Sequence, residues 1–300
     1  MKAGVREVKF FLLGLLIFLN ILAWLTVYEI SQPQSLEVNF FDVGQGDAIF
    51  IKDQKLHQVL IDGGPDSTVL EKLGKEIPFW DNTLDLIILT HPEKDHVSGL
   101  IEVLKRYKVE NILWTGVVRD TAEYKEWKKL IEEEGAKIFI AKAGQKIIIP
   151  RTVGPSQRLG GWREGCSLGI LYPLENLEGQ ELKDSNNTSI VVKLIFGENS
   201  FLFTGDAYKS VERDLIEKGI DVDSDILKVA HHGSKTSSSE EFIKAVSPQE
   251  AIISVGKDNK YGHPHREVLE TLAKYGINIL RTDLNGDIKI ICDSQSLKLK

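Results

Sequence analysis

Side chains of the types that bind metal ions are concentrated in a short segment that follows an apolar run of this sequence. The run Leu86–Leu89 has no polar residue, which is typical of a strand buried on both faces of a sheet. The imidazole and carboxylate groups of the next segment, THPEKDH, belong to His91, Glu93, Asp95 and His96. Groups of this kind are costly to bury unless they are paired or bind a metal ion. Their spacing therefore predicts a divalent metal site on the loop that leaves the strand.

A polar loop that caps a helix is the alternative interpretation of the same segment. It would make Asp95 the N-cap of a helix predicted over Val97–Tyr107. It leaves His91 and His96 without a role, and for that reason we favour the metal site.

Further polar clusters follow other strand-like runs. Asp62 precedes two glycines, and Asp206 follows the run FLFTG. His231 and His232 stand together after Ile226–Ala230. Each aspartate can be an ordinary turn residue, because Asp-Gly and Gly-Asp pairs are common in turns, whereas an adjacent pair of histidines is less well explained by turn chemistry. Loops at one edge of a sheet can bring such residues together, and we expect them to share one site.

The N-terminal part of the sequence predicts a single transmembrane helix. Phe10–Tyr28 contains no charged residue and spans ~28 Å as a helix, about the thickness of the hydrocarbon core of a bilayer. Three basic residues precede it, which places the N-terminus in the cytoplasm. A cleaved signal peptide is the alternative, but the run is longer than usual and no small-x-small site follows it. We therefore predict a cytoplasmic stub, anchor and linker over residues 1–35, and a domain outside the cytoplasm over residues 36–300.

Composition limits the classes of partner. The net charge is −7 and the pI is about 5.6, so no general basic field attracts nucleic acid, and a polyanionic substrate would need a metal ion or a local basic patch. A hydrophobic content of 42% is enough for a substantial core. The two cysteines, Cys166 and Cys292, can either pair or remain free thiols of the core, and the sequence leaves both open.

The rest of the sequence alternates strand-like runs with polar turns and a few helical segments. Helices are predicted over Val97–Tyr107, Tyr124–Glu134, Lys209–Lys218, Ser239–Val246 and Arg266–Tyr275. Strands are predicted over Leu36–Val43, Ala48–Lys52, Gln58–Ile61, Leu86–Leu89, Lys137–Ile140, Lys146–Ile149, Leu168–Tyr172, Ser189–Ile195, Ser200–Phe203, Ile226–Ala230, Ala251–Val255, Ile279–Arg281 and Ile288–Ile291. The stretch Gly154–Gly165 is predicted to be a surface loop.

Together these segments resemble the metallo-β-lactamase superfamily. More narrowly, FFDVGQGDA, ILTHPEKDHVSGL, NNTSIVVKL, FLFTGDA, LKVAHHGSKTSSS and YGHPH resemble the extracytoplasmic hydrolase domain of ComEC-type DNA-internalization (competence) proteins, in family order from Leu36 to Cys292. The resemblance implies an α+β fold, the αββα sandwich of two mixed sheets with helices outside, and a metal site at the sheet edges.

The ligands that the resemblance implies depart from the superfamily's HxHxDH motif. Glu93 stands in place of the second histidine, and no histidine between His96 and His231 can supply the usual ligand of the third motif, where this sequence has Asn187 and Ser189. The first metal position would use His91, Glu93 and a bridging Asp206, and the second would use Asp95, His96, Asp206 and one of His231 or His232. Oxygen-rich ligation makes Mn²⁺ as acceptable as Zn²⁺, and either one or two ions can be bound.

The activity implied by the resemblance is metal-dependent hydrolysis by a membrane-anchored, extracytoplasmic enzyme, and we expect a phosphodiesterase or nuclease that acts on DNA. The predicted catalytic residues are Asp62, which orients the loop or the attacking water, Asp95, and His263, which contacts phosphate or protonates the leaving group. Ser234 and Lys235 are predicted to bind substrate together with His263. The implied partners are the membrane, DNA and a DNA-uptake channel, with no organic cofactor. A hydrolase of the same fold acting on a cell-wall or lipid-linked phosphoester or another ester, and a non-catalytic metal-dependent binding protein, are the alternatives.

Overall fold

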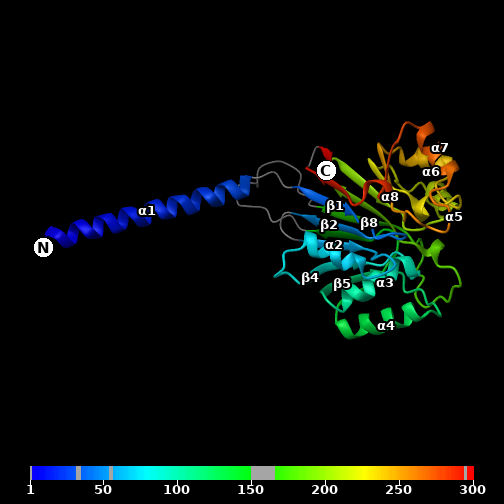
Figure 1. Ribbon diagram of the computed structural model, residues 1–300, viewed down its shortest axis with the longest axis horizontal. Coiled ribbons are helices and arrows are strands. Elements are labelled where there is room, and N and C mark those ends of the chain that lie inside the picture. Colours follow the sequence, from blue (N-terminus) through cyan, green and yellow to red (C-terminus); the bar gives the residue numbers. More distant parts are fainter. Residues whose placement is uncertain (1, 32–34, 54–56, 150–165, 294–295) are drawn as a thin grey trace. The chain divides into compact units, whose positions relative to one another are not determined.

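A computed structural model describes residues 2–31, 35–53, 57–149, 166–293 and 296–300 (Figure 1). It divides into an N-terminal helix and a sandwich, and each is described by itself. The helix α1 (Lys2–Ser31) contains Lys9–Tyr28, which within the described residues is the one helical segment that has the length and apolar composition needed to cross a membrane. The predicted loop Gly154–Gly165 lies outside the described residues.

The sandwich consists of two mixed sheets. The first has the order β15-β14-β1-β2-β3-β4-β5-β6 and the second has the order β13-β12-β11-β10-β9-β8-β7. The strands of the first sheet are β1 (Leu36–Phe40), β2 (Ile49–Asp53), β3 (Gln58–Ile61), β4 (Thr83–Ile88), β5 (Lys108–Trp114), β6 (Lys137–Ile140), β14 (Ile288–Cys292) and β15 (Leu297–Leu299). Those of the second are β7 (Lys146–Ile149), β8 (Cys166–Tyr172), β9 (Val191–Phe196), β10 (Asn199–Phe203), β11 (Ile226–Lys228), β12 (Glu250–Ile253) and β13 (Asn278–Arg281).

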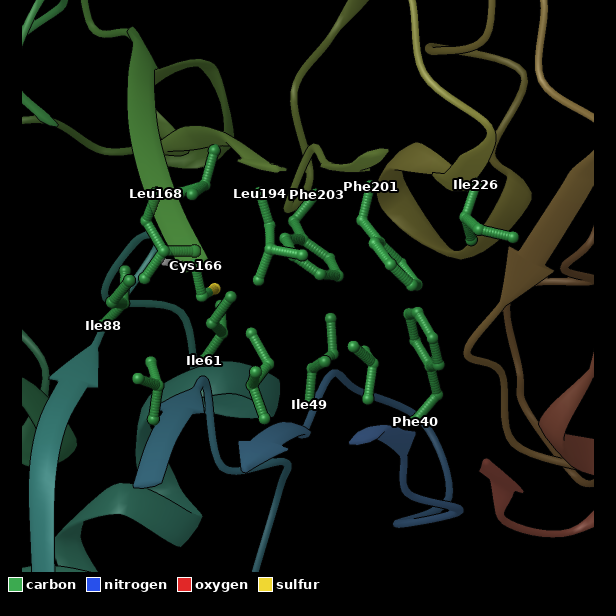
Figure 2. Packing of buried hydrophobic residues seen from close by; sticks show 14 of the residues in the cluster. Phe40, Ile49, Ile61, Ile88, Cys166, Leu168, Leu194, Phe201, Phe203 and Ile226 are labelled. Atoms are coloured by element: carbon green, nitrogen blue, oxygen red, sulfur yellow. The ribbon is translucent and has the colours of Figure 1, made fainter. Parts of the chain in front are cut away.

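Three apolar layers hold the sandwich together. Between the sheets, side chains such as Phe40, Ile61 and Phe203 interdigitate in a core without water-exposed members (Figure 2). The outer face of the first sheet is covered by α2 (Thr68–Glu76), α3 (Lys94–Leu104) and α4 (Ala122–Glu134), and that of the second by α5 (Lys209–Glu217), α6 (Glu240–Val246) and α7 (Arg266–Lys274). A short helix, α8 (Thr282–Asn285), follows β13. The predicted αββα architecture is confirmed.

Strand direction separates two edges of the sandwich. Strands β3 to β6 run parallel in the first sheet, and β10 to β13 run parallel in the second. The loops that follow β3, β4, β10 and β11 carry the predicted ligands, so these ligands gather at the edge where the parallel strands end. Strand β1 begins at the opposite edge, because its first residue, Leu36, pairs with Asp53 at the end of β2. We call the edge where the parallel strands end the cleft edge, and the opposite edge, where β1 begins, the tether edge.

The structure departs from the sequence predictions at several elements, among them β15, which was not predicted, and β1 and β4, of which one end lies three residues from the prediction. Strand β5 was not predicted, because Lys108, Glu110 and Asn111 interrupt its apolar pattern, although the strand lies between β4 and β6. Helix α3 begins three residues earlier than the predicted Val97, and its N-cap is Glu93 rather than Asp95. Asp95 therefore lies in the first turn of the helix, where a carboxylate is favoured by the helix dipole.

The two cysteines do not form a disulfide. Cys166 and Cys292 are free thiols buried in the core between the sheets. Burial raises the pKa of each thiol to about 12, so both behave as small apolar side chains.

Candidate metal centre

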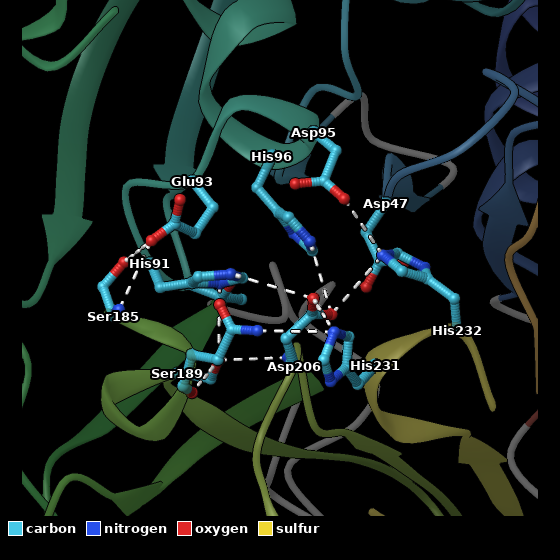
Figure 3. Close-up of polar contacts among 12 residues, drawn as sticks. Asp47, His91, Glu93, Asp95, His96, Ser185, Ser189, Asp206, His231 and His232 are labelled. Atoms are coloured by element: carbon cyan, nitrogen blue, oxygen red, sulfur yellow. Dashed lines mark hydrogen bonds and ion pairs between the residues drawn. The ribbon is translucent and has the colours of Figure 1, made fainter. Parts of the chain in front are cut away.

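Four ligand atoms converge at the cleft edge. They belong to Asp95 and His96 on the first turn of α3, to Asp206 after β10, and to His232 in the short 3-10 segment η3 (Ala230–Gly233), and all lie within 4.8 Å of one another (Figure 3). The Oδ1 atom of Asp206 is 3.3 Å from His96 Nε2 and 3.6 Å from His232 Nε2. His232 Nε2 is also 3.4 Å from an Asp95 oxygen. The structure thus brings together the ligands predicted for the second metal position and selects His232 from the histidine pair.

The chemistry of these atoms fits a divalent cation. Three of them, His96 Nε2, His232 Nε2 and Asp206 Oδ1, are buried and have no hydrogen-bond partner among the described residues. Buried polar atoms are nearly always satisfied in folded proteins, and a convergent set of buried atoms with free lone pairs is the arrangement that a bound cation satisfies. Two imidazoles and two carboxylates suit Zn²⁺ or Mn²⁺.

Hydrogen bonds orient both imidazoles with Nε2 toward this group. His232 Nδ1 lies 2.8 Å from the backbone carbonyl of Ser254, which can only accept, so Nδ1 carries a proton and, in the neutral imidazole that binds a metal ion, the lone pair is on Nε2. His96 Nδ1 is 2.8 Å from Asp62 Oδ2. Asp62 is fully buried and also accepts from the backbone N–H of Thr90 at 2.8 Å and from its hydroxyl at 2.6 Å. Asp62 therefore positions His96 and the loop after β4, as metal-site carboxylates commonly do.

Close backbone packing allows Asp62 to reach His96. The backbone N–H of Gly63 donates to the carbonyl of His96 at 2.8 Å, and that of Gly99 donates to Gly64 at 3.0 Å. A Cβ on Gly99 would lie 1.8 Å from the carbonyl oxygen of Gly63. Only glycine lets α3 approach the loop after β3 this closely.

The second carboxylate oxygen of Asp206 faces two more imidazoles. His91 Nε2 is 3.9 Å from Asp206 Oδ2, and His231 Nε2 is 3.7 Å from it. His91 Nδ1 contacts the hydroxyls of Thr90 at 3.0 Å and Ser189 at 3.3 Å.

Both of those hydroxyls use their hydrogens elsewhere. Thr90 donates to Asp62, and Ser189 donates to the carbonyl of Asn186 at 2.7 Å. His91 Nδ1 must therefore be the donor, which leaves a lone pair on its buried Nε2, and this atom has no partner within the described part of the chain. Two acceptors, His91 Nε2 and Asp206 Oδ2, face each other, as at the predicted first metal position.

Glu93 is turned away from the other candidate ligands. Its Oε1 accepts from the Ser185 hydroxyl at 2.7 Å and lies 2.8 Å from an Arg119 nitrogen (Figure 3). Arg119 also donates to the carbonyl of Leu182 at 2.7 Å. The compact group of four ligands does not include Glu93, so its role as a ligand stays a prediction, and the observed contacts favour a structural role.

Charge compensation dominates the electrostatics of the centre. Burial by itself would raise the pKa of Asp206, but His232 and His96 hold it well below the ordinary value. Burial by itself would lower the pKa of His232, yet Asp206, Asp47 and Asp95 raise it to about 10. Burial and the neighbouring His96 lower the pKa of His91 to about 3, which keeps it neutral. The buried carboxylates of the centre are stabilised by positive charge nearby. A bound divalent cation would supply this charge in place of protons on the imidazoles.

A buried ion pair beneath the centre was missed by the sequence analysis. Lys228, fully buried at the end of β11, donates from Nζ to Asp47 Oδ2 at 2.6 Å. The other Asp47 oxygen lies 3.4 Å from His232 Nδ1. Asp47 resembled an ordinary turn residue in GQGD, and the one available signal was a lysine inside the apolar run ILKVA.

An open cleft lies above the ligand group. It encloses about 450 Å³, and its floor includes Asp95, Asp206 and His232. The other lining residues are Gln45, Glu93, Arg119, Lys183, Asp184, Asn186, Tyr208, His231, Tyr261 and His263.

The predicted substrate contacts fall partly outside this cleft. His263 lines it, with its ring stacked on that of Tyr261, whereas Ser234 is buried and bonds to Thr236, and Lys235 does not line it. Burial and the nearby His232 and His231 lower the pKa of His263 to about 4. The basic groups of the cleft are instead Arg119 and Lys183, which the sequence analysis did not single out.

Similarity to known proteins agrees with this architecture. Residues 167–257 match the Metallo-beta-lactamase superfamily. The chain is 35% identical over 271 residues to ComE operon protein 3 of Bacillus subtilis and 30% identical over 257 residues to Competence protein ComA of Neisseria gonorrhoeae, in both cases over 84% of this chain and 32% of the relative. It thus spans about a third of the length of these relatives.

A solved structure shares the fold. CmlA, a diiron β-hydroxylase from Streptomyces venezuelae, superposes with a TM-score of 0.52 at 13% identity, over 87% of this chain and 55% of that one. With this fold, these relatives and a candidate ligand group at the edge where the parallel strands end, the chain is a ComEC-like protein with the metallo-β-lactamase fold.

Proposed function

We propose that this chain is a metal-dependent phosphodiesterase that acts on DNA and is anchored to a membrane by α1, with the sandwich outside the cytoplasm. The observation that carries the proposal is the position of the buried ligand group, which forms the floor of an open cleft lined by Arg119 and Lys183. An acidic chain can hold a polyanion at such a place, because the charge that attracts the phosphate is local.

In this proposal the residues of the cleft have separate roles in metal binding, orientation of the ligands and substrate binding. One metal ion would be held by Asp95, His96, Asp206 and His232. A second ion would be held between Asp206 and the imidazoles of His91 and His231. A divalent ion supplies Lewis acidity toward a phosphate oxygen and lowers the pKa of water. Asp62 and Ser254 set the orientation of the two imidazoles, and Lys183 attracts the phosphate backbone, whereas the charge of Arg119 is paired with Glu93. His263, at the mouth of the cleft, stays our candidate for phosphate contact or leaving-group protonation.

The membrane and DNA parts of the proposal rest on different observations. The apolar segment Lys9–Tyr28 supports the anchor, and the basic residues before it support a cytoplasmic N-terminus. The names of the relatives, which include a competence protein, support a role in DNA uptake, and association with an uptake channel is part of the same proposal.

A metal-dependent assay of the full chain in detergent tests the activity. We expect Mn²⁺ or Zn²⁺ to support cleavage of both DNA and a bis-aryl phosphodiester, and Asp206→Asn to abolish it, whereas Asp223→Asn, an exposed carboxylate outside the cleft, stays active. Cleavage of the aryl ester without cleavage of DNA would favour a cell-wall or lipid-linked phosphoester. No hydrolysis with any divalent ion would leave a metal-dependent binding protein.

A further inference from the structure

Two adjacent aromatic side chains project into solvent from one loop. Phe79 and Trp80, between α2 and β4, are 90% and 69% exposed. Their rings contact each other edge to face, with centroids 4.8 Å apart at an interplanar angle of 84°. Single exposed apolar residues are ordinary, but a pair of large rings that touch each other rather than the core forms an apolar tip that needs a partner.

The loop that carries the pair is held in place. Ile77 and Leu73 bury its α2 side in the core. On its β4 side the backbone N–H of Asp81 donates to Pro78 at 2.9 Å, and the Asp81 carboxylate accepts from the hydroxyl of Thr83 at 2.7 Å. The two rings are therefore presented by a fixed turn rather than by a loose segment.

The loop lies at the tether edge. Phe79 and Trp80 precede Thr83, the first residue of β4, and β4 runs from the tether edge to the cleft edge. Leu36, the first residue of β1, lies at this same edge. Only five residue steps separate Leu36 from Ser31, the last residue of α1, so the chain between them spans at most ~18 Å. A membrane that holds α1 is therefore within reach of this edge.

Two basic residues, Arg106 and Lys108, lie just before and at the start of β5, the strand that pairs with β4. Lys108 pairs with Thr83 in the sheet, and its backbone N–H donates to Asn82 at 2.8 Å. Lys108 and Arg106 are exposed, and neither has an ion-pair partner among the residues that the structure describes. The nearby carboxylate of Asp81 accepts from the Thr83 hydroxyl and from the Gln58 amide, the latter at 2.6 Å, so it stays charged but forms no ion pair with Arg106 or Lys108 among the described residues. That of Asp85 accepts from the backbone N–H of Gln58, also at 2.6 Å.

We propose that Phe79, Trp80, Arg106 and Lys108 form a docking surface for the anionic lipid interface of the membrane that holds α1. This proposal rests on the membrane anchoring in the proposed function. Aromatic rings favour the interfacial layer of a bilayer, and each nearby Lys or Arg adds attraction to anionic headgroups. Strand β4 has six residues and spans ~20 Å, so docking at its first residue would turn the cleft edge away from the lipid.

Quenching of tryptophan fluorescence by brominated lipid tests the docking in the full chain. Phospholipids brominated near the headgroup end of the acyl chain are mixed into phosphatidylglycerol vesicles. Trp114 and Trp127 are buried, and all variants carry Trp162→Phe, so two reporters remain. Adding Trp24→Phe leaves a reporter of the loop, and adding Trp80→Phe instead leaves a reporter of α1.

We expect both reporters to be quenched. A quenched α1 reporter with an unquenched Trp80 overturns the docking surface and leaves the anchor intact, whereas an unquenched α1 reporter overturns the anchor itself. Quenching of Trp80 should fall at least twofold when Arg106→Glu and Lys108→Glu are combined. The matched reversal of Lys125 and Lys128 on α4 should leave it unchanged. An equal loss in the two charge reversals would overturn the assignment of Arg106 and Lys108.

Discussion

The side chain of Asp206 faces both groups of candidate ligands. Oδ1 lies among His96 and His232, and Oδ2 faces His91 and His231. Asp206→Asn keeps the shape but removes the charge that both sides share. We expect bound Mn²⁺ or Zn²⁺ to fall more than tenfold after dialysis, as measured by elemental analysis. Metal content equal to that of the parent would exclude Asp206 as a ligand.

Glu93 separates two hypotheses at the scale of one side chain. If Glu93 is a ligand, the Glu93→Gln variant should bind the first metal ion more weakly than the parent does. As the observed partner of Arg119 and Ser185, it would instead lose about 1–2 kcal/mol of stability, because a charged hydrogen bond at a mostly buried guanidinium is weakened.

We expect the second result, from a metal titration and a chemical denaturation of the same variant. Weaker binding of every ion with unchanged stability would restore Glu93 as a ligand. Glu93→His would then be expected to shift preference toward zinc, since imidazole is a softer donor than carboxylate.

At the scale of elements, the contact between α3 and the loop after β3 determines whether His96 meets Asp62. Gly99→Ala would force a Cβ against the carbonyl of Gly63, and we expect a loss of about 2–3 kcal/mol together with weaker metal binding. Gly74→Ala is the matched control, because Gly74 is also helical and nothing lies within 4 Å of its Cβ position. It should be neutral or stabilising by up to about 1 kcal/mol. Equal thermal melts for the two variants would contradict the close approach.

Helix α2 is tied to the first sheet by a charge network that responds to pH. Burial by itself would raise the pKa of Glu76, but hydrogen bonds from Lys289 and Lys52 lower it below the ordinary 4.5. A lowered carboxyl pKa stabilises the fold above the unfolded pKa, and this stabilisation disappears as the pH falls through the folded value.

We therefore expect Glu76→Gln to cost about 1 kcal/mol at neutral pH and progressively less below pH 4.5, measured by urea unfolding at each pH. A difference from the parent that stayed constant with pH would show that the ion pairs do not contribute.

At the scale of the whole molecule, the proposed anchor α1 would place the cleft on one side of a membrane. If Phe10–Tyr28 remains as an anchor with the sandwich outside, protease added to intact cells should digest the sandwich. N-terminal sequencing of the mature protein provides the control, because a chain that begins near Ser31 would identify a cleaved signal instead.

Much of the fold and the types of the ligands follow from local sequence. Buried strands such as β4 are short apolar runs, and the polar residues that end them stand out because they are costly in a core. The helices α4 to α7 and most strands were therefore predicted within two residues of their observed ends. Strand β5 was not predicted, because its polar residues interrupt the apolar pattern and the strand forms through pairing with its neighbours in the sheet.

The sequence by itself determined which loops carry the candidate ligands, and only the tertiary structure decided which of their atoms meet. The tertiary structure placed His232 rather than His231 in the compact ligand group. It also paired Lys228 with Asp47, which is 181 residues away in the sequence. It also left Phe79 and Trp80 in solvent, although their composition alone would favour burial. Local patterns report the cost of burying each residue, whereas the partner that offsets this cost comes from distant chain segments and exists only after the sheets have packed.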